Sequence, residues 1–131
     1  ESVVITLEVS PDAEGVRWPP EVEYAAFMIA REATGNALLH ASAGSIELRL
    51  DGDAGRLSLS VSDDGIGLHG SLMYGRPGHL GMVGMRERAL AIGGQLAVQG
   101  SPSGGTVIAL GWTVGSDRFQ PPANLSTAGD P

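Results

Sequence analysis

The sequence predicts a two-layer α/β sandwich in which a mixed, mostly antiparallel sheet is covered on one face by helices. Several short stretches alternate apolar and polar residues, as strands with one buried face do, and two longer stretches favour helices. Hairpin-type turns join some of these strands, so their neighbours are expected to run antiparallel. A sheet with one apolar face has to be covered, and the helices are the elements available for it.

The bulk properties fit one globular domain. The chain has 131 residues, of which 42% are hydrophobic and 18% charged, an ordinary balance for a single core. The absence of cysteine excludes disulfides, thiolate metal sites and cysteine nucleophiles. A formal net charge of −7 argues against a general nucleic-acid surface. No apolar run approaches the ~18 residues of a membrane span. The amino terminus is not signal-like. Because the chain begins at Glu1 without an initiating Met, we expect a domain excised from a longer protein.

The first quarter of the chain predicts a strand, a loop and a long helix. The strand is expected at Val3 to Val9 and the loop at Pro11 to Trp18. Pro19 and Pro20, followed by two glutamates, favour a helix start, because proline suits the first turn and acids suit the positive end of the dipole. The helix is expected to continue to Ala41. One face of the strand carries Val3, Ile5, Leu7 and Val9.

A hairpin is predicted next. Ser45 to Leu50 and Arg56 to Ser62 both alternate, and Asp51 to Gly55 has the composition of a turn. The inward residues are expected to be Ile46, Leu48, Leu50, Leu57, Leu59 and Val61.

The rest of the chain predicts a loop, a second helix and two more strands. In chain order these are a loop at Leu68 to Leu80, a helix at Val83 to Ile92, a strand at Gln95 to Gln99, a turn at Ser101 to Gly105 and a strand at Thr106 to Val114. Gly93 and Gly94 end the helix. From Gly115 onward the composition predicts a mobile tail.

One stripe of the long helix is polar. Glu32, Asn36 and His40 recur every four residues and therefore share one side of the helix. An asparagine oxygen suits magnesium, which takes few protein ligands and completes its shell with water and phosphate. A carboxylate one turn earlier is placed to accept a proton or to orient a nucleophile. The alternative is a solvent-exposed stripe with no function, in which His40 only caps the helix.

A second motif directly follows a predicted strand and reads Asp63-Asp64-Gly65-Ile66-Gly67. A carboxylate at a strand end can accept a hydrogen bond from an exocyclic amine such as that of adenine. The glycines permit a sharp turn and the approach of a flat base. Asp64 is expected to be exposed. An ordinary strand-ending turn is the alternative.

A third motif places Gly78, Gly81 and Gly84 at three-residue spacing before the second helix. Free amides at a helix start bind phosphate, and glycine leaves room for it. The motif is neither a Walker loop nor a dinucleotide fingerprint, since Gly-Lys-Ser/Thr is absent and no strand leads directly into it. Thr106, after Gly105, is placed to bring a hydroxyl near the carboxylate of the second motif, although a threonine that merely ends a turn is common.

With these motifs in order, the chain resembles the ATP-binding catalytic domain of bacterial two-component sensor histidine kinases, within the GHKL superfamily of gyrase, heat-shock chaperone, histidine kinase and mismatch-repair ATPases. The likeness covers roughly residues 1 to 114, which leaves 115 to 131 as a tail expected to be disordered, and it implies the Bergerat ATP-binding fold. Residues 32 to 41 look like the asparagine box and residues 63 to 67 like the Asp-x-Gly-x-Gly box. Residues 81 to 88 and 105 to 107 look like the later glycine boxes. The short lid, followed by Gly-Met-Arg-Glu-Arg, is similar to the subgroup that pairs with helix-turn-helix response regulators.

The resemblance implies a role for each of these residues. Asp63 would bind the adenine amine, with Thr106 assisting through water, and Asn36 would hold magnesium. Glu32 would be the catalytic base or the acid that orients the nucleophile. The backbone contacts to phosphate would come from Gly81, Val83, Gly84 and Met85. The other residues assigned to ATP are His40, Ala41, Gly65, Ile66 and Gly67. The loop from Leu68 to Met82 would be the lid.

Two departures from the family pattern predict weaker ATP binding. The family often has Lys or Arg where this chain has Leu39, and Gly35 stands where a larger residue is usual. The chain also lacks a phosphoacceptor histidine, because His40, His69 and His79 all lie within or beside the nucleotide motifs.

The resemblance therefore implies a domain that binds Mg-ATP and donates the γ-phosphoryl group to a histidine on a separate dimerisation domain. The implied partners are that domain, a response regulator and, in the full-length protein, a second copy, with no nucleic acid and no direct membrane contact. The implied location is the cytoplasm, including the cytoplasmic part of a membrane-anchored sensor. Two alternatives stay open: a serine kinase of the anti-sigma-factor type, and a degenerate nucleotide-binding or interaction module.

Overall fold

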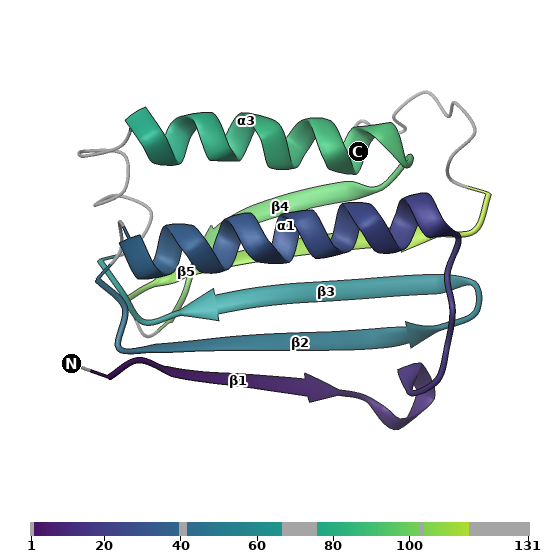
Figure 1. Cartoon of the computed structure of the whole chain (residues 1–131), viewed down its shortest axis with the longest axis horizontal. Helices are drawn as coiled ribbons and strands as arrows, with labels where there is room; N and C mark the ends of the chain where they lie inside the picture. The colour runs from purple at the N-terminus through teal and green to yellow at the C-terminus, as the bar shows by residue number, and fades with distance from the viewer. Residues whose placement is uncertain (1, 40–41, 67–75, 103, 116–131) are drawn as a thin grey trace.

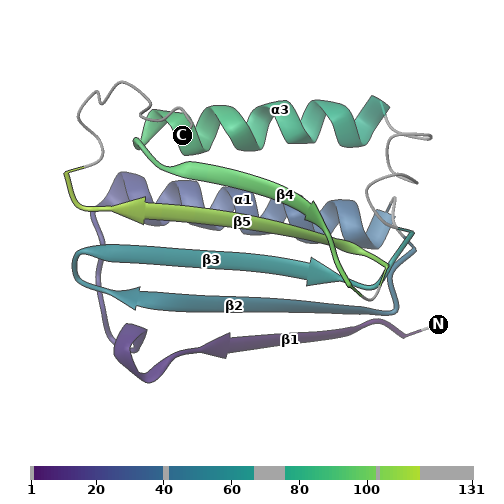
Figure 2. The same ribbon diagram turned by 180° about the vertical axis from the view of Figure 1, so that it is seen from behind.

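The computed structural model describes residues 2–39, 42–66, 76–102 and 104–115, with only the backbone of residues 76–81. One five-stranded sheet has the order β1-β2-β3-β5-β4, and two long helices lie against one of its faces (Figures 1 and 2). The elements are β1 (Val4–Val9), the 3₁₀ turn η1 (Pro11–Ala13), α1 (Pro20–Leu39), β2 (Ser45–Asp53), β3 (Arg56–Asp63), α3 (Arg76–Ala91), β4 (Gln95–Gly100) and β5 (Thr106–Thr113). β1 and β2 pair in parallel, and the other pairs of this sheet are antiparallel. The predicted two-layer sandwich is confirmed.

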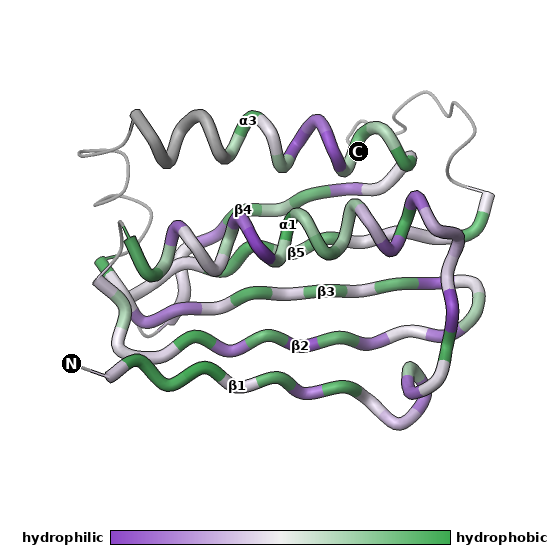
Figure 3. The backbone as a smooth tube through the Cα atoms, viewed as in Figure 1, coloured by the Kyte–Doolittle hydropathy of each residue, from purple (hydrophilic) through white to green (hydrophobic). Residues whose placement is uncertain are grey.

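The core lies between the helices and the middle of the sheet. In β3, Leu57, Leu59 and Val61 are buried and alternate with half-buried serines on the open face. β5 contributes Ile108, Leu110 and Trp112, and α1 contributes Val22, Ala25, Ile29, Ala33 and Ala37. Figure 3 shows these strands as alternating bands, as expected for a sheet with one covered face. The inward positions predicted for β3 are confirmed.

The start of α1 is held by a local network. The carbonyl of Pro19 accepts hydrogen bonds from the amides of Val22 and Glu23 at 2.9 and 3.0 Å. The Glu23 carboxylate accepts two bonds from the Arg17 guanidinium, both 2.8 Å, and a third from the Trp18 amide at 3.0 Å. These bonds, those from Arg17 first, lower the pKa of Glu23 to about 2. The predicted helix start after the two prolines is confirmed.

The hairpin between β2 and β3 is tighter than predicted. The sequence placed the turn at Asp51 to Gly55, but strand pairing continues to Asp53 opposite Arg56. Gly52 makes this possible: its φ is 141°, and a Cβ there would lie 2.1 Å from the Arg56 carbonyl oxygen. The indole N–H of Trp18 donates to the carbonyls of Asp53 and Arg56 at 2.8 and 3.0 Å. The loop before α1 is thereby fastened to the hairpin.

The second long helix begins earlier than predicted. We expected a lid from Leu68 to Met82 and a helix from Val83, but α3 already begins at Arg76. The part of the predicted lid from residue 76 onward is therefore helical. The missed signal is Pro77, which suits a first helical turn; the nearby glycines suggested a loop instead. Residues 68–75 lie outside the described part of the chain.

The first strand is less buried than its pattern suggested. Ile5, Leu7 and Val9 share one face, as predicted, because they pair with Ile46, Leu48 and Leu50. Ile5 and Leu7 are nevertheless 50% and 64% exposed, since both helices lie toward the other edge of the sheet (Figure 1). Neither described helix has the length and hydropathy needed to cross a lipid bilayer.

Candidate functional site

Three of the sequence motifs lie at the same end of the sheet. The C-terminal end of α1, the end of β3 and the start of β5 meet at the left of Figure 1, and α3 begins there too. Asn36 and Glu32 belong to the last turns of α1, where Asn36 is half-buried and Glu32 exposed. The Asn36 amide makes no hydrogen bond to the described residues. The fold thus gathers segments that are far apart in the sequence.

Asp63 and Thr106 stand side by side at this end. β3 and β5 pair up to Ser62 opposite Val107, so the next position brings Asp63 to Thr106. The backbone of Gly105 lies directly against Asp63, because a Cβ there would come within 1.8 Å of the Asp63 carbonyl oxygen and 2.8 Å of its Oδ1. Only glycine permits this approach.

The polar atoms of this pair are partly unsatisfied. Asp63 Oδ1 accepts the Gly65 amide at 2.8 Å, while no described residue donates to Oδ2. Thr106 is only 8% exposed, and its hydroxyl has no partner in the described structure. A buried hydroxyl without a partner is unusual in proteins. The pair therefore offers a carboxylate oxygen and a hydroxyl to a ligand or a bound water.

Asp64 has a structural task that the sequence did not reveal. Its Oδ1 accepts the amides of Gly44 and Ser45 at 2.8 and 2.9 Å, and its Oδ2 accepts the Ser45 hydroxyl at 3.0 Å. These bonds, the Ser45 amide first, hold the pKa of the Asp64 carboxyl below its usual value. Asp64 is exposed, as predicted, yet it ties the end of β3 to the start of β2. This contact fixes the turn that follows Asp63.

The Asp64→Asn variant should unfold at a lower temperature than the parent protein at neutral pH, because an amide accepts these hydrogen bonds less well than a carboxylate. A carboxyl with a lowered folded pKa stabilises the protein above its unfolded pKa, and this contribution is lost as the pH falls through the folded pKa. The difference in melting temperature should therefore shrink as the pH falls below about 4, the ordinary pKa of an aspartate. Glu87→Gln is the control, because this exposed carboxylate has no hydrogen-bond or ion-pair partner among the described residues. A difference that stays constant with pH would contradict the role of Asp64.

The α3 residues assigned to phosphate lie inside the helix. Val83 is 42% exposed, Gly84 is half-buried and Met85 is 1% exposed. Because an amide at position i pairs with the carbonyl at i−4, the unpaired amides of a helix are those of its first four residues. In this structure those are residues 76–79, of which Pro77 has no N–H.

The remaining predicted residues fall into two groups. Gly65 is half-buried and Ile66 is 41% exposed, both directly after β3. Gly81 is described only as helical backbone in α3. His40, Ala41 and Gly67 lie outside the described residues. Leu39, at the end of α1, is 78% exposed.

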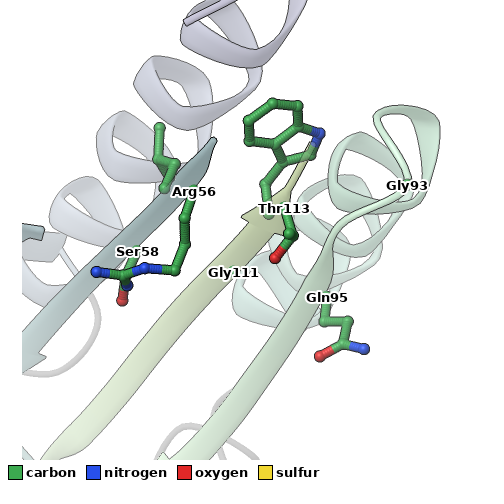
Figure 4. Close-up of a pocket in the computed structure, with 8 residues that line it drawn as sticks. Arg56, Ser58, Gly93, Gln95, Gly111 and Thr113 are labelled. Carbon is green, nitrogen blue, oxygen red and sulfur yellow. The ribbon is translucent and has the colours of Figure 1, made fainter. Parts of the chain in front are cut away.

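A hollow at the opposite end of the sheet is separate from this site. It has a volume of about 260 Å³ and lies around Gly111, flanked by Arg56, Ser58 and Gln95 (Figure 4). It forms because Gly111 has no side chain between Ser58 and Gln95, its register partners on either side. Since β3 runs from Arg56 to Asp63, the hollow and the candidate site are a full strand length apart.

The described residues do not form an all-protein metal site, because no three His, Asp or Glu side chains among them converge. Asn36, half-buried in the last turn of α1, offers a hard oxygen ligand at the end of the helix where the motifs gather. Such a donor fits magnesium bound mainly by water and phosphate oxygens.

The chain is similar to a known protein family and to several known proteins. A family model described as "Histidine kinase-, DNA gyrase B-, and HSP90-like ATPase" matches residues 21–114. The signal transduction histidine-protein kinase/phosphatase DegS of Brevibacillus brevis is 31% identical over 110 residues, which are 84% of this chain and 28% of that protein. The sensor histidine kinase YxjM of Bacillus subtilis is 39% identical over 104 residues, with coverage of 75% and 24%. The chain thus spans about a quarter of the length of these relatives.

Solved structures have the same fold. The histidine kinase domain of a blue-light activated histidine kinase from Erythrobacter litoralis superposes with a TM-score of 0.66 at 22% identity, covering 88% of this chain and 54% of that one. The ATP-binding domain of PrrB from Mycobacterium tuberculosis gives a TM-score of 0.58 at 20% identity, with coverage of 86% and 80%.

Proposed function

Because the chain belongs to the family of histidine kinase-, DNA gyrase B- and HSP90-like ATPases, we propose that it binds Mg-ATP and donates the γ-phosphoryl group to a histidine on a separate helical domain. The observation that carries the proposal is the pairing of Asp63 with Thr106. A free carboxylate oxygen and a buried, unpartnered hydroxyl lie together at the end of two central strands.

Asp63 is proposed to recognise adenine. Its Oδ1 is held by the Gly65 amide, which fixes the carboxylate and leaves Oδ2 available to the exocyclic amine. Thr106 would complete the contact through a water molecule, which the unsatisfied hydroxyl supports. A carboxylate accepts from adenine, whereas the carbonyl of guanine at the same position would be repelled. The site should therefore prefer ATP to GTP.

Asn36 is proposed to hold magnesium, and Glu32 to act on the incoming nucleophile. The two residues are one helical turn apart on α1, so they face the same side. The metal would supply charge neutralisation of the phosphates. Glu32 is exposed, so a histidine on another domain can approach it. Positioning of this kind is what phosphoryl transfer chiefly requires.

The phosphates are proposed to lie at the amino end of α3, against the backbone of Gly81, Val83, Gly84 and Met85. The amides of these residues are inside the helix in this structure, since α3 begins at Arg76. Phosphate contact through them therefore requires the first turns of α3 to open around the nucleotide. The glycines lower the cost of that opening, because each makes a helix about 1 kcal/mol less stable than alanine does.

Replacing Gly84 by alanine should raise the melting temperature of the free domain and weaken Mg-ATP binding. A Cβ at Gly84 meets nothing within 4 Å, so the gain in helix stability, up to about 1 kcal/mol, is not offset by a clash. The same gain opposes the opening that the nucleotide needs. Thermal unfolding and Mg-ATP titration measure the two effects. Gly35→Ala in α1, equally free of contacts, should raise the melting temperature without lowering the affinity. Unchanged affinity of Gly84→Ala would contradict the opening of α3.

The phosphoryl transfer is tested with radiolabelled ATP. The domain alone should bind nucleotide without labelling itself. A histidine-bearing helical domain of a sensor histidine kinase, supplied in trans, should become labelled. The label should be lost in acid and retained in alkali, as for phosphohistidine. An acid-stable label on serine, or the absence of nucleotide-dependent thermal stabilisation at millimolar Mg-ATP, would contradict the proposal.

The proposed partners follow from the same chemistry. They are the phosphoacceptor domain of the full-length protein, which is dimeric in this proposal, and a response regulator that receives the phosphoryl group. The proposed location is the cytoplasm, where ATP is available. Residues 1–114 would form the catalytic domain and residues 115–131 a tail without a role in it.

A further inference from the structure

On the helix-covered face of the sheet, neither of the described helices lies over the strip along β1. Both described helices lie toward β3, β5 and β4 in the two opposite views (Figures 1 and 2). Ile5 and Leu7 belong to this face, because they pair with Ile46 and Leu48, which contact the core. They are 50% and 64% exposed, and Figure 3 shows β1 as largely hydrophobic. Apolar side chains left exposed together mark an interaction surface.

A second apolar set lies on the outer side of α1. Tyr24, Phe27 and Leu38 are 58%, 62% and 43% exposed. Tyr24 faces α3, where its ring centre is 5.7 Å from the guanidinium carbon of Arg88. Phe27 is three residues further on, so its side chain is turned by about 60° from that of Tyr24 around the helix axis, away from α3. It therefore faces the side on which the strip lies.

The strip has the width of one helix. Packed helices lie about 8–10 Å apart, and neighbouring strands about 4.8 Å apart. A helix beside α1, on the side away from α3, therefore lies two strands further out and runs over β1. The flank of α1 that it would contact carries the half-buried Ala30 and Thr34. Small side chains at these positions let two helices approach closely.

We propose that a second copy of this domain supplies that helix, in a two-fold symmetric dimer whose axis runs parallel to the strands. Such an axis lays α1 of each copy over the β1 strip of the other, with the two α1 helices parallel and in contact. Ile5 and Leu7 of one copy then cover Phe27 and Leu38 of the other, and the reverse. Both exposed sets are used at once, as a self-complementary interface requires.

The charges and the area agree with a second copy. Arg31, on the outer side of α1, is long enough to reach the rim. Glu23, seven residues before Ala30 and on the same flank of α1, is already paired with Arg17 at 2.8 Å. The exposed fractions of the five apolar residues leave roughly 500 Å² per copy, at about 150–250 Å² for a large side chain. Two copies would bury roughly 1,000 Å², the lower limit of a specific interface. The association should be weak, on the order of 10–100 µM.

Sedimentation velocity of the 131-residue chain over a concentration series tests the dimer. The mass should rise from 13.4 kDa towards twice that value, without any nucleotide. Leu7→Lys and Phe27→Lys should each weaken the dimer about tenfold or more. Both side chains are more than half exposed, so the variants should fold, which thermal unfolding checks. Val4→Lys is the matched control, since Val4 is 59% exposed on the opposite face of the same strand.

Cysteine cross-linking tests the geometry, because the chain has no cysteine of its own. Ala30 lies beside the proposed axis, so Ala30→Cys should form a disulfide with its counterpart under mild oxidation. Leu90→Cys, on an exposed site of α3 away from the strip, should not. Three results would overturn the proposal: a monomer at about 0.5 mM, equal weakening by Val4→Lys and Leu7→Lys, or cross-linking through residue 90 in preference to residue 30.

Discussion

The Asp63→Asn variant should bind Mg-ATP roughly 10–100-fold more weakly than the parent domain while remaining folded. The amide keeps an oxygen that can accept the Gly65 amide, now bonded at 2.8 Å, so the turn after β3 should survive. Its other half presents an N–H₂ group to the adenine amine, which places a donor against a donor. A hydrogen bond to a charged group contributes about 1.5–3 kcal/mol, and about 1.4 kcal/mol corresponds to tenfold in affinity. Isothermal titration with Mg-ATP measures the change.

The chain offers a matched control for this substitution. Asp53 Oδ1 accepts the Gly55 amide at 2.9 Å, the same local arrangement as at Asp63, but at the end of β2, at the opposite end of the sheet from the candidate site. The Asp53→Asn variant should therefore bind Mg-ATP like the parent domain. Equal weakening of both variants would point to a general effect of charge and would remove Asp63 as the adenine contact.

Replacing Gly105 by alanine should have the largest effect on folding and binding together. The added Cβ would come within 1.8 Å of the Asp63 carbonyl oxygen and 2.5 Å of its carbonyl carbon, distances that backbone atoms cannot accept. The ends of β3 and β5 must then separate, at a cost of about 2–4 kcal/mol in the free energy of unfolding. Asp63 and Thr106 would no longer stand side by side, so Mg-ATP binding should fall with stability. Chemical denaturation and nucleotide titration measure the two losses.

Gly100→Ala, at the end of β4, is the control that shows whether any glycine-to-alanine change beside this turn has the same effect. Gly100 pairs with Thr106 across β4 and β5, and a Cβ there meets nothing within 4 Å. Its substitution should change neither stability nor affinity by much. If Gly105→Ala were as stable as Gly100→Ala, the close approach of Gly105 to Asp63 would not exist in solution.

The features that the sequence predicted well are those that arise from local patterns. The alternation of Leu57, Leu59 and Val61 identified the buried face of β3 because each strand residue faces the side opposite to its neighbours. The two prolines before Glu21 identified the start of α1, since proline suits the first turn. These signals need no knowledge of distant contacts, and the structure confirms both.

The features that the sequence predicted poorly depend on contacts between distant segments. Asp64 accepts hydrogen bonds from Gly44 and Ser45, about twenty positions away, and no local sequence pattern predicts such a partner. The pattern placed Ile5 and Leu7 on one face of their strand, but whether that face is buried depends on whether a helix lies above it. Asp51 to Gly55 has turn composition, yet pairing with β3 extends the strand to Asp53.

The location of the candidate site was predicted in part. The motifs predicted which residues carry the chemistry, and the fold places Asp63, Thr106 and the end of α1 at one end of the sheet (Figure 1). The prediction for α3 was less accurate, because its glycines suggested a loop where the structure has a helix from Arg76. The roles of the individual residues remain predictions.

Titration of the isotope-labelled domain with Mg-ATP, followed by backbone NMR, tests most directly whether the purine contact and the metal ligand share one site. If they do, the amide signals of Asn36, Gly65 and Thr106 should shift together and saturate with one dissociation constant. Signals of Gln95 and Gly111, beside the distant hollow, should stay in place. Shifts confined to that hollow, or a response of Thr106 and Gly65 without any response of Asn36, would contradict a common site for the nucleotide and its cation.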